Sequence, residues 1–264
     1  MRRAPLARVL RVAVAAAMLA LAACGSDITD DSNGDVGQAE VQPELFTLTM
    51  NNAGSSFVDQ IEAEPVIVEA RNEAKQELHP VFARLNEGVT PREVANQLKK
   101  NVEGVLKLVV IAGSTEAVKP GSSVQNVFEF VPGNYLATDP EAAGKNPGLT
   151  WFFEVVEATG PEVAEPDSDA ALEVGDFYFE FPDGIASGDV TFVVSNAGEQ
   201  SHEVIISKGK REMGFFLAPP PGGRAWQTMR LPVPGKYTAV CYFPDPKSGK
   251  PHIKLGMKTS FEVS

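Results

Sequence analysis

The chain has 264 residues, a length that allows one or two domains. Asp and Glu number 35 against 23 Lys and Arg, and the resulting net charge of −12 argues against nucleic acid as a partner. Hydrophobic residues make up 43% of the chain, enough to bury a core, while 23 Gly and 20 Pro favour short strands and turns over helical bundles.

The N-terminus has the pattern of an export signal. Four arginines precede an apolar run at residues 12–22, which is too short for an ordinary membrane-spanning helix. The run ends in "LAAC", residues 21–24, which resembles the lipobox of bacterial lipoproteins. That resemblance implies removal of residues 1–23 and a lipid anchor on Cys24, which would hold the protein at the membrane on the extracytoplasmic side. The alternative is an ordinary secretory signal whose cleavage site happens to include a cysteine.

Composition divides the rest of the chain. Residues 24–42 are polar, acidic and nearly free of aromatic side chains, which predicts a flexible tether. Acidic residues and prolines cluster again at 160–169, which predicts a linker. The linker would separate one domain at 43–159 from a second at 170–264.

The two halves repeat the same landmarks in the same order. Each opens with a strand-like segment, at 45–50 and 176–181, and continues through a β-branched run and a polar turn to a histidine. Each later has a Pro-Gly-x-Tyr-x-Ala segment and closes on a strand. This order predicts a duplicated β domain, so the fold class is all-β with two tandem β-sandwiches. The alternative is that unrelated β domains reuse Pro-Gly turns.

One short helix is predicted as an insertion in the first half. Thr90 is followed by Pro91 and, three residues after the threonine, by Glu93, which is a capping box with proline at the first helical position. Val94 and Leu98 then lie on one face.

The second half resembles the cupredoxins, the blue-copper Greek-key β-sandwiches. The residues that carry the resemblance are "SNAGEQSHEV" and "PGKYTAVCYFPD", followed by "GKPHIKLGM" and the strand "KTSFEV". The resemblance implies a mononuclear copper site with His202 as the early ligand. It also implies Cys241, His252 and Met257 as the late ligands before the last strand. The first half resembles a degenerate copy.

These residue types suit one-electron chemistry. A thiolate is a soft ligand for Cu(I), imidazole binds both oxidation states, and a weak axial thioether completes a geometry that serves both. If Cys24 carries lipid, Cys241 is the only free thiol of an exported protein. It would then be buried and inert, paired between molecules, or bound to a metal.

The spacing between Cys241 and His252 departs from the resemblance. Ten residues separate them, whereas familiar blue-copper loops are much shorter. The extra residues would form an excursion that returns His252 to the metal, or would mark a lost or altered site. Zinc bound by the two histidines and the cysteine is a further alternative, although it leaves Met257 unexplained.

The first half offers no equivalent ligand set. Asp139 stands at the place of Cys241, and no His or Met follows it in "PEAAGKNPGLTW". His79 lies near the place of His202, with one extra residue in the turn. We expect the first half to hold no copper, and its role to be structural.

The leading hypothesis is a membrane-anchored copper protein that transfers single electrons to or from a protein partner and is not an enzyme. The chain has no HExxH, GxSxG, P-loop or GxGxxG motif and only three histidines, which argues against hydrolytic or multicopper chemistry. One alternative is a copper carrier or chaperone with the same ligands. Another is a copper-free β-sandwich scaffold or interaction module, in which Cys241 is buried and inert.

Overall fold

The computed structural model describes residues 40–264, and Val41–Ser264 forms one compact unit. The predicted signal peptide, the predicted lipid anchor at Cys24 and residues 24–39 of the predicted tether lie outside the described residues. No helix within the described range is long and apolar enough to cross a membrane.

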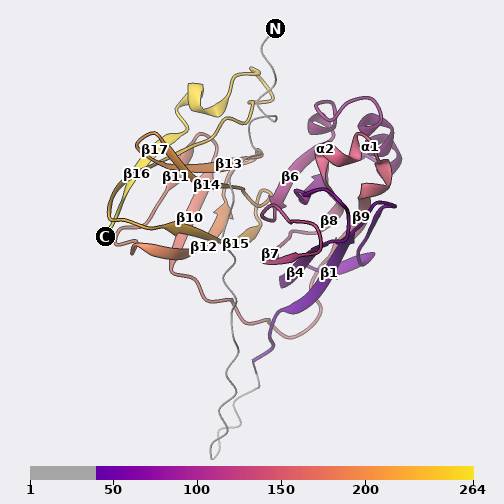
Figure 1. Ribbon diagram of the computed structural model, residues 1–264, viewed down its shortest axis with the longest axis horizontal. Coiled ribbons are helices and arrows are strands. Elements are labelled where there is room, and N and C mark those ends of the chain that lie inside the picture. Colours follow the sequence, from indigo (N-terminus) through magenta and orange to yellow (C-terminus); the bar gives the residue numbers. More distant parts are fainter. Residues whose placement is uncertain (1–39) are drawn as a thin grey trace, which may run out of the picture. The chain divides into compact units, whose positions relative to one another are not determined.

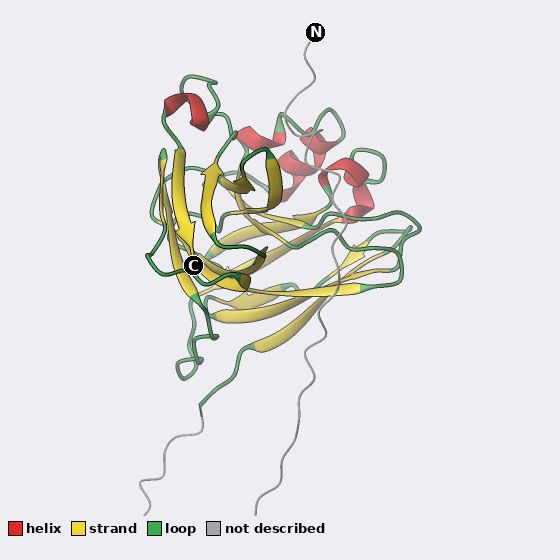
Figure 2. Cartoon of the chain, turned by 60° about the vertical axis from the view of Figure 1, so that its left-hand side comes forward, coloured by secondary structure: helices red, strands yellow, loops and turns green. Residues whose placement is uncertain are grey.

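The described residues are mostly β-strand, which confirms the all-β prediction (Figures 1 and 2). The strands form one sheet of eight strands, one of five and one of four. The strands are β1 (Glu44–Met50), β2 (Ser55–Ser56), β3 (Gln60–Glu62), β4 (Pro65–Asn72), β5 (Val81–Leu85), β6 (Val109–Ser114), β7 (Ser123–Glu129), β8 (Gly133–Thr138), β9 (Thr150–Val156), β10 (Ala170–Gly175), β11 (Tyr178–Glu180), β12 (Gly188–Asn196), β13 (Glu203–Lys208), β14 (Arg211–Leu217), β15 (Arg224–Leu231), β16 (Gly235–Val240) and β17 (Lys258–Val263). The short helices are α1 (Pro91–Leu98), α2 (Pro140–Ala143), η2 (Val105–Lys107), η3 (Pro147–Leu149) and η4 (His252–Leu255).

Each half has its own buried core. In β12, alternate residues are buried, as expected for a strand with one face toward a core. Phe192 from this strand packs in a cluster that draws only on residues 170–263 and also contains Tyr237 and Phe261. The first-half cluster draws on residues 48–155 together with Ala225, and it contains aromatic rings that meet edge-on, tilted or stacked.

The two halves repeat strand pairing as well as sequence. Strand β1 runs parallel to β4, and β10 runs parallel to β12, so β10 is the counterpart of β1. The sequence match of 45–50 with 176–181 was therefore wrong. Strand β11 within that second segment has three residues and pairs antiparallel with β10.

Matching hydrogen bonds support the duplication. The hydroxyl of Tyr135 donates to the carbonyl oxygen four residues earlier at 2.7 Å, and that of Tyr237 does the same at 2.8 Å. The amide nitrogen Nδ2 of Asn72 donates to the carbonyl oxygen four residues later at 2.8 Å, and that of Asn196 does so at 3.1 Å. These bonds fix the same two turns in each half.

The eight-stranded sheet runs through both halves. Its order is β11-β10-β12-β15-β7-β4-β1-β2, so the halves join where β15 pairs antiparallel with β7. Arg224 lies opposite Glu129 at this junction, and its Nε donates to the carboxylate at 2.6 Å. The sheet and the hydrophobic clusters do not by themselves fix domain limits, and the linker at 160–169 stays a prediction.

The predicted helix is present as α1. Glu93 N donates to Thr90 Oγ1 at 3.3 Å and Glu93 Oε2 accepts from Thr90 N at 2.9 Å, which completes the capping box. Val94 and Leu98 are buried on one face of the helix. Helix α2, which the sequence analysis did not predict, begins after Asp139 as its N-cap.

Candidate metal centre

Strand ends place the four predicted ligands at one edge of the second half. His202 directly precedes β13, Cys241 directly follows β16, and Met257 directly precedes β17. His252 opens η4. All four residues have an exposed fraction of 0%.

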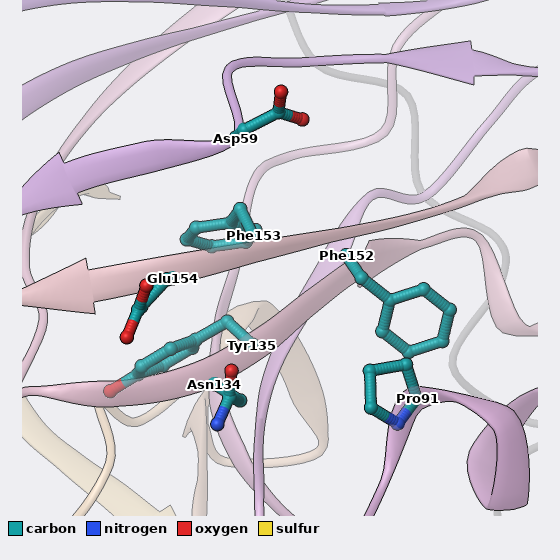
Figure 3. A pocket seen from close by; sticks show the side chains of 7 residues that line it. All are labelled: Asp59, Pro91, Asn134, Tyr135, Phe152, Phe153 and Glu154. Atoms are coloured by element: carbon teal, nitrogen blue, oxygen red, sulfur yellow. The ribbon is translucent and has the colours of Figure 1, made fainter.

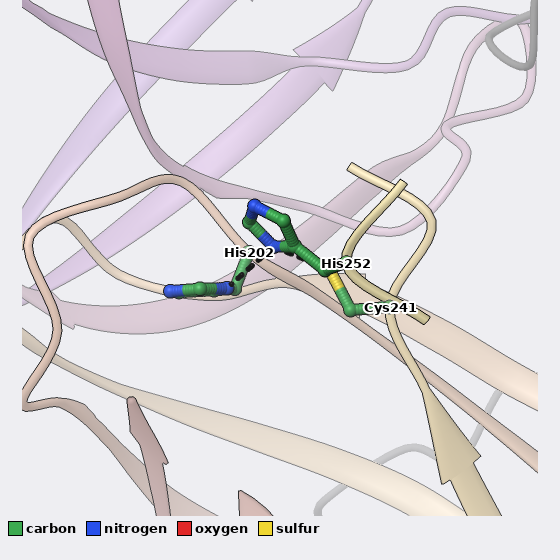
Figure 4. A group of neighbouring side chains, drawn as sticks. All are labelled: His202, Cys241 and His252. Carbon is green, nitrogen blue, oxygen red and sulfur yellow. Dashed lines mark hydrogen bonds between the residues drawn. The ribbon is translucent and has the colours of Figure 1, made fainter. Parts of the chain in front are cut away.

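Three donor atoms converge (Figure 4). The Nδ1 atoms of His202 and His252 lie 3.2 Å apart, and Cys241 Sγ lies 3.5 Å from His252 Nδ1. All three donor atoms lie within 4.8 Å of one another. The structure therefore brings together three of the four residues that the sequence predicted as ligands.

Met257 is tied to this cluster through its backbone. Its N–H donates to the carbonyl oxygen of His252 at 3.0 Å, and its own carbonyl oxygen accepts from Cys241 N at 3.3 Å. Its side chain belongs to the same buried cluster as that of Cys241. These contacts place Met257 beside the other three residues, and its role as an axial ligand stays a prediction.

The ten residues between Cys241 and His252 form a closed excursion. His252 N donates to the carbonyl oxygen of Phe243, and Ile253 N donates to that of Cys241, both at 2.8 Å. These two bonds clamp the base of the excursion, so the length of the loop does not separate the two ligands. This explains how a site can survive the long spacing.

The excursion is also held from within. Pro244 and Pro251 face each other in an isolated antiparallel bridge. Beyond them, Asp245 N donates to Lys250 O at 2.8 Å, and the Asp245 carboxylate accepts from Ser248 N at 2.7 Å. Asp245 is itself buried, which leaves the excursion a compact hairpin rather than a loose loop.

The thiol of Cys241 lies in a setting that keeps it protonated without a metal. Burial raises its pKa to about 12, and its sulfur accepts a hydrogen bond from Glu203 N at 3.5 Å. The carboxylate of Glu203 in turn accepts from Tyr242 N at 2.8 Å, which fixes the chain beside the sulfur. A bound metal would replace the thiol proton, because the thiolate is the ligand.

Both imidazole rings of the cluster are neutral, which is the form that can bind a metal ion. Burial lowers the pKa of His202 to about 4 and also lowers that of His252, so both rings are uncharged at pH 7. His202 Nε2 lies 3.1 Å from Asp176 Oδ1, and His252 Nε2 lies 3.1 Å from Gln200 Oε1. Each oxygen accepts a hydrogen bond from the ring Nε2–H, which leaves the lone pair of Nδ1 facing the site.

Asp176 and Gln200 were not predicted as site residues from the sequence. Gln200 lies within the motif that carried the resemblance, two residues before His202, and spacing alone does not show that it reaches His252. Asp176 lies 26 residues before His202 and comes close because β10 pairs with β12. A buried histidine that binds a metal through one ring nitrogen needs a hydrogen-bond partner for the other nitrogen. This requirement was the one indication in the sequence that such partners exist.

Two contacts tie the ligand loops to the first half. Ile111 N in β6 donates to Oγ of Ser201, the residue before His202, at 2.8 Å. Phe243, two residues after Cys241, packs against buried clusters of both halves. The first half therefore contacts both segments that carry the predicted ligands, and its structural role stays a prediction.

Strand register corrects the equivalence of His79. Strands β5 and β8 pair as β13 and β16 do, and the aligned registers put Leu78 at the place of His202. His79 takes the place of Glu203, and the two turns are equal in length. The predicted extra residue in the first-half turn is therefore wrong. The same registers put Asp139 at the place of Cys241, as predicted from the sequence.

The donor set suits copper. One thiol sulfur and two imidazole nitrogens, all buried, with a methionine adjacent, is the combination of soft and intermediate ligands that copper accepts in both oxidation states. Zinc would also accept the three ligands, but it gives no reason for Met257. The site therefore fits the predicted mononuclear copper ion.

A separate hollow in the first half has a volume of about 190 Å³ (Figure 3). It shares no residue with the metal cluster and contains no histidine or cysteine. Its lining comprises Asp59, Pro91, Asn134, Tyr135, Phe152, Phe153 and Glu154. It offers nothing that would act on a metal bound in the second half.

Solved structures similar to this chain include copper proteins. A reduced auracyanin from the photosynthetic bacterium Roseiflexus castenholzii is 14% identical, with 45% of this chain and 99% of that chain covered and a TM-score of 0.31. A multicopper oxidase is 15% identical over 87% of this chain and 94% of that chain, with a TM-score of 0.27. A copper-containing nitrite reductase from Thermus scotoductus is 16% identical over 84% of this chain and 62% of that chain, with a TM-score of 0.25.

No protein-family profile matches the chain, and no curated protein matches it. The structural likenesses are too distant to assign a function. The predicted resemblance to cupredoxins is confirmed by the chain's own architecture, namely its β-sheets and the convergence of His202, Cys241 and His252.

Proposed function

We propose that the protein binds one copper ion and passes single electrons to or from a protein partner. The observation that carries this proposal is the convergence of His202 Nδ1, Cys241 Sγ and His252 Nδ1 within 4.8 Å in a buried site. Copper would supply the one-electron couple. The protein's part is to hold neutral imidazoles and a thiolate in a fixed arrangement, so that little has to move when the electron moves.

Burial favours electron transfer over copper delivery. A carrier hands over its metal when ligands of the acceptor enter the site and displace its own. His202, Cys241, His252 and Met257 all have an exposed fraction of 0%, and the excursion is clamped at its base. Electrons can leave such a site through bonds and short contacts, whereas a metal ion cannot leave without opening it.

We also propose that the protein transforms no substrate. Of the three histidines in the chain, two are in the site and the third, His79, takes the place of Glu203 in the first half. A second copper cluster of the kind an oxidase needs would require more ligands of this type. The buried donors also leave no exposed position at which a substrate would meet the metal.

The proposed location rests on the N-terminal sequence. Lipid on Cys24 would hold the protein to the membrane on its extracytoplasmic side, where an electron-transfer partner would meet it. Mass spectrometry of the N-terminal peptide from the native host tests this. A diacylglyceryl-modified Cys24 at the new N-terminus supports the anchor, and an unmodified cysteine at that position contradicts it.

Absorption spectroscopy tests the copper site. One equivalent of Cu(II) added to the purified full chain should give an intense visible band from thiolate-to-copper charge transfer. Cys241→Ser should abolish the band, and Asp139→Asn, which alters the corresponding position in the first half, should leave it intact. A wild-type protein that binds no copper would overturn the proposal and leave the copper-free scaffold hypothesis.

A further inference from the structure

The segment that carries two of the four predicted ligands, His252 and Met257, is basic in an acidic chain. Residues 242–258, here called the metal loop, contain four lysines and one acidic residue, Asp245. The whole chain has a net charge of −12. Asp245 is buried, and its carboxylate accepts a hydrogen bond from Ser248 N within the same loop. The charge that the metal loop presents outward is therefore positive.

The lysines of the metal loop are exposed and unpaired. Ion pairs in the described part of the chain involve arginines and histidines, and none involves a lysine of this loop. The four lysines are Lys247, Lys250, Lys254 and Lys258. Four exposed cationic groups without counter-ions make a local positive potential that attracts anionic surfaces.

The fold holds these lysines beside the site. Lys250 and Lys254 each lie two residues from His252, and Lys258 directly follows Met257. The clamp at the base of the excursion and the bond from Lys254 N to the carbonyl oxygen of Pro251 at 2.8 Å keep this part of the chain compact. A partner attracted by the lysines would therefore arrive close to the metal.

One exposed aromatic side chain lies next to the buried cluster along the chain. The outer nitrogens of both ligand histidines are covered by Asp176 and Gln200, and neither ring is exposed. Tyr242, covalently adjacent to Cys241, has an exposed fraction of 43%. Its ring is thus an exposed aromatic group joined to the thiolate ligand by a short path of bonds.

We propose that the metal loop is the docking surface for an acidic redox protein, with Tyr242 at the contact. The proposal rests on the proposed function and names the partner's chemistry. One electron passes from the reduced metal site to an oxidised centre in the partner, which is reduced by one electron. An anionic membrane surface is a poorer occupant, because the acidic remainder of the chain would be repelled by an extended negative surface.

Small redox probes test the charge of the surface. The full chain, loaded with copper and reduced, is oxidised by hexacyanoferrate(III) in a stopped-flow instrument, and the visible band reports the reaction. At low ionic strength we expect a rapid reaction that slows as salt is added. The double variant Lys250→Glu, Lys254→Glu should react about tenfold more slowly at low salt and lose that salt dependence.

The matched control changes the same total charge elsewhere. Lys99→Glu, Lys100→Glu alters two exposed lysines at the end of α1, and its rate should stay within about twofold of wild type. Equal slowing of the two double variants would show that only net charge matters and would overturn the docking proposal. Tyr242→Ser should slow the reaction while the visible band is unchanged. An unchanged rate would overturn the role of Tyr242.

A copper-independent measurement separates this proposal from the proposed function. Hexacyanochromate(III), a paramagnetic anion that is not reduced, should broaden amide NMR signals of residues 247–258 in the metal-free protein. Broadening spread over the chain would overturn the docking surface whether or not copper binds. Vesicles of phosphatidylglycerol give the remaining test. Binding that the Lys250→Glu, Lys254→Glu variant abolishes would assign the loop to a lipid surface instead, and no binding would support a protein partner.

Discussion

The backbone N–H of His79 donates to Oδ2 of Asp139 at 2.7 Å. The equivalent bond in the second half runs from Glu203 N to Cys241 Sγ at 3.5 Å. The first half therefore retains the hydrogen bond to the ligand position although it has no thiol there. Asp139 also caps α2, because its Oδ1 accepts from Ala142 N at 2.7 Å. In the first half the carboxylate has a structural role at the position where the second half has Cys241, a predicted ligand.

Replacing this carboxylate should destabilise the protein without touching the metal site. Asp139→Ala removes a helix cap and leaves the partly buried N–H of His79 without its acceptor, a combined cost of about 2–4 kcal/mol. Urea unfolding of the metal-free protein measures this loss. Asp139→Asn keeps an acceptor oxygen and should lose less than half as much. Loss of the visible copper band in folded Asp139→Ala, without urea, would show that Asp139 and the metal site are not independent.

The order of motifs predicted three residues that converge in the fold, His202, Cys241 and His252, and the capping box predicted α1. Both predictions depend on residues close together in sequence. His79 was matched to His202 because it is the nearest histidine. Only the pairing of β5 with β8 shows that Leu78 has that place. Asp176 could not be predicted as a partner of His202, since the contact depends on a parallel strand pair that brings distant residues together.

The carboxylate of Asp176 should strengthen copper binding through His202. It accepts a hydrogen bond from His202 Nε2–H, which orients the ring and increases the electron density at Nδ1. Asp176→Asn should lower the affinity for Cu(II) about 10- to 100-fold, as measured by competition with a chelator of known affinity. The control is Asp183→Asn, an exposed aspartate on the loop after β11, which should bind copper as wild type does. Equal affinities in both variants would show that Asp176 plays no part in metal binding.

The excursion should be dispensable for copper binding. The bonds from His252 N to Phe243 O and from Ile253 N to Cys241 O lie at its base, outside residues 245–250. Replacing 245–250 with Asn-Gly, a pair suited to a tight hairpin turn, should keep the visible copper band. Phe243→Ala tests the base instead, because it removes a ring that packs on both halves, and it should destabilise the protein by about 3 kcal/mol. Loss of the band in the shortened protein would mean that the excursion itself builds the site.

Acid should destabilise the metal-free protein through its buried histidines. The pKa of His202 falls from 6.5 to about 4 on folding, because burial disfavours the charged ring. Below pH 6.5 the unfolded chain therefore binds a proton that the folded chain does not. Stability is lost as the pH falls from 6.5 toward 4, by roughly 3 kcal/mol for this residue, and is fully present above pH 6.5. His252, whose pKa is also lowered, adds a loss of the same sign.

Urea unfolding of the metal-free protein between pH 4 and pH 8 measures this dependence. The matched variant is His202→Leu, since Leu78 occupies the equivalent place in the first half and shows that the fold accepts leucine there. Groups that titrate in both proteins cancel in the difference, so the variant should lose less stability than wild type between pH 6.5 and pH 4. If the two proteins lose the same amount, His202 is not held neutral by the fold. The imidazole would then have to shed a proton before it could bind copper at acidic pH.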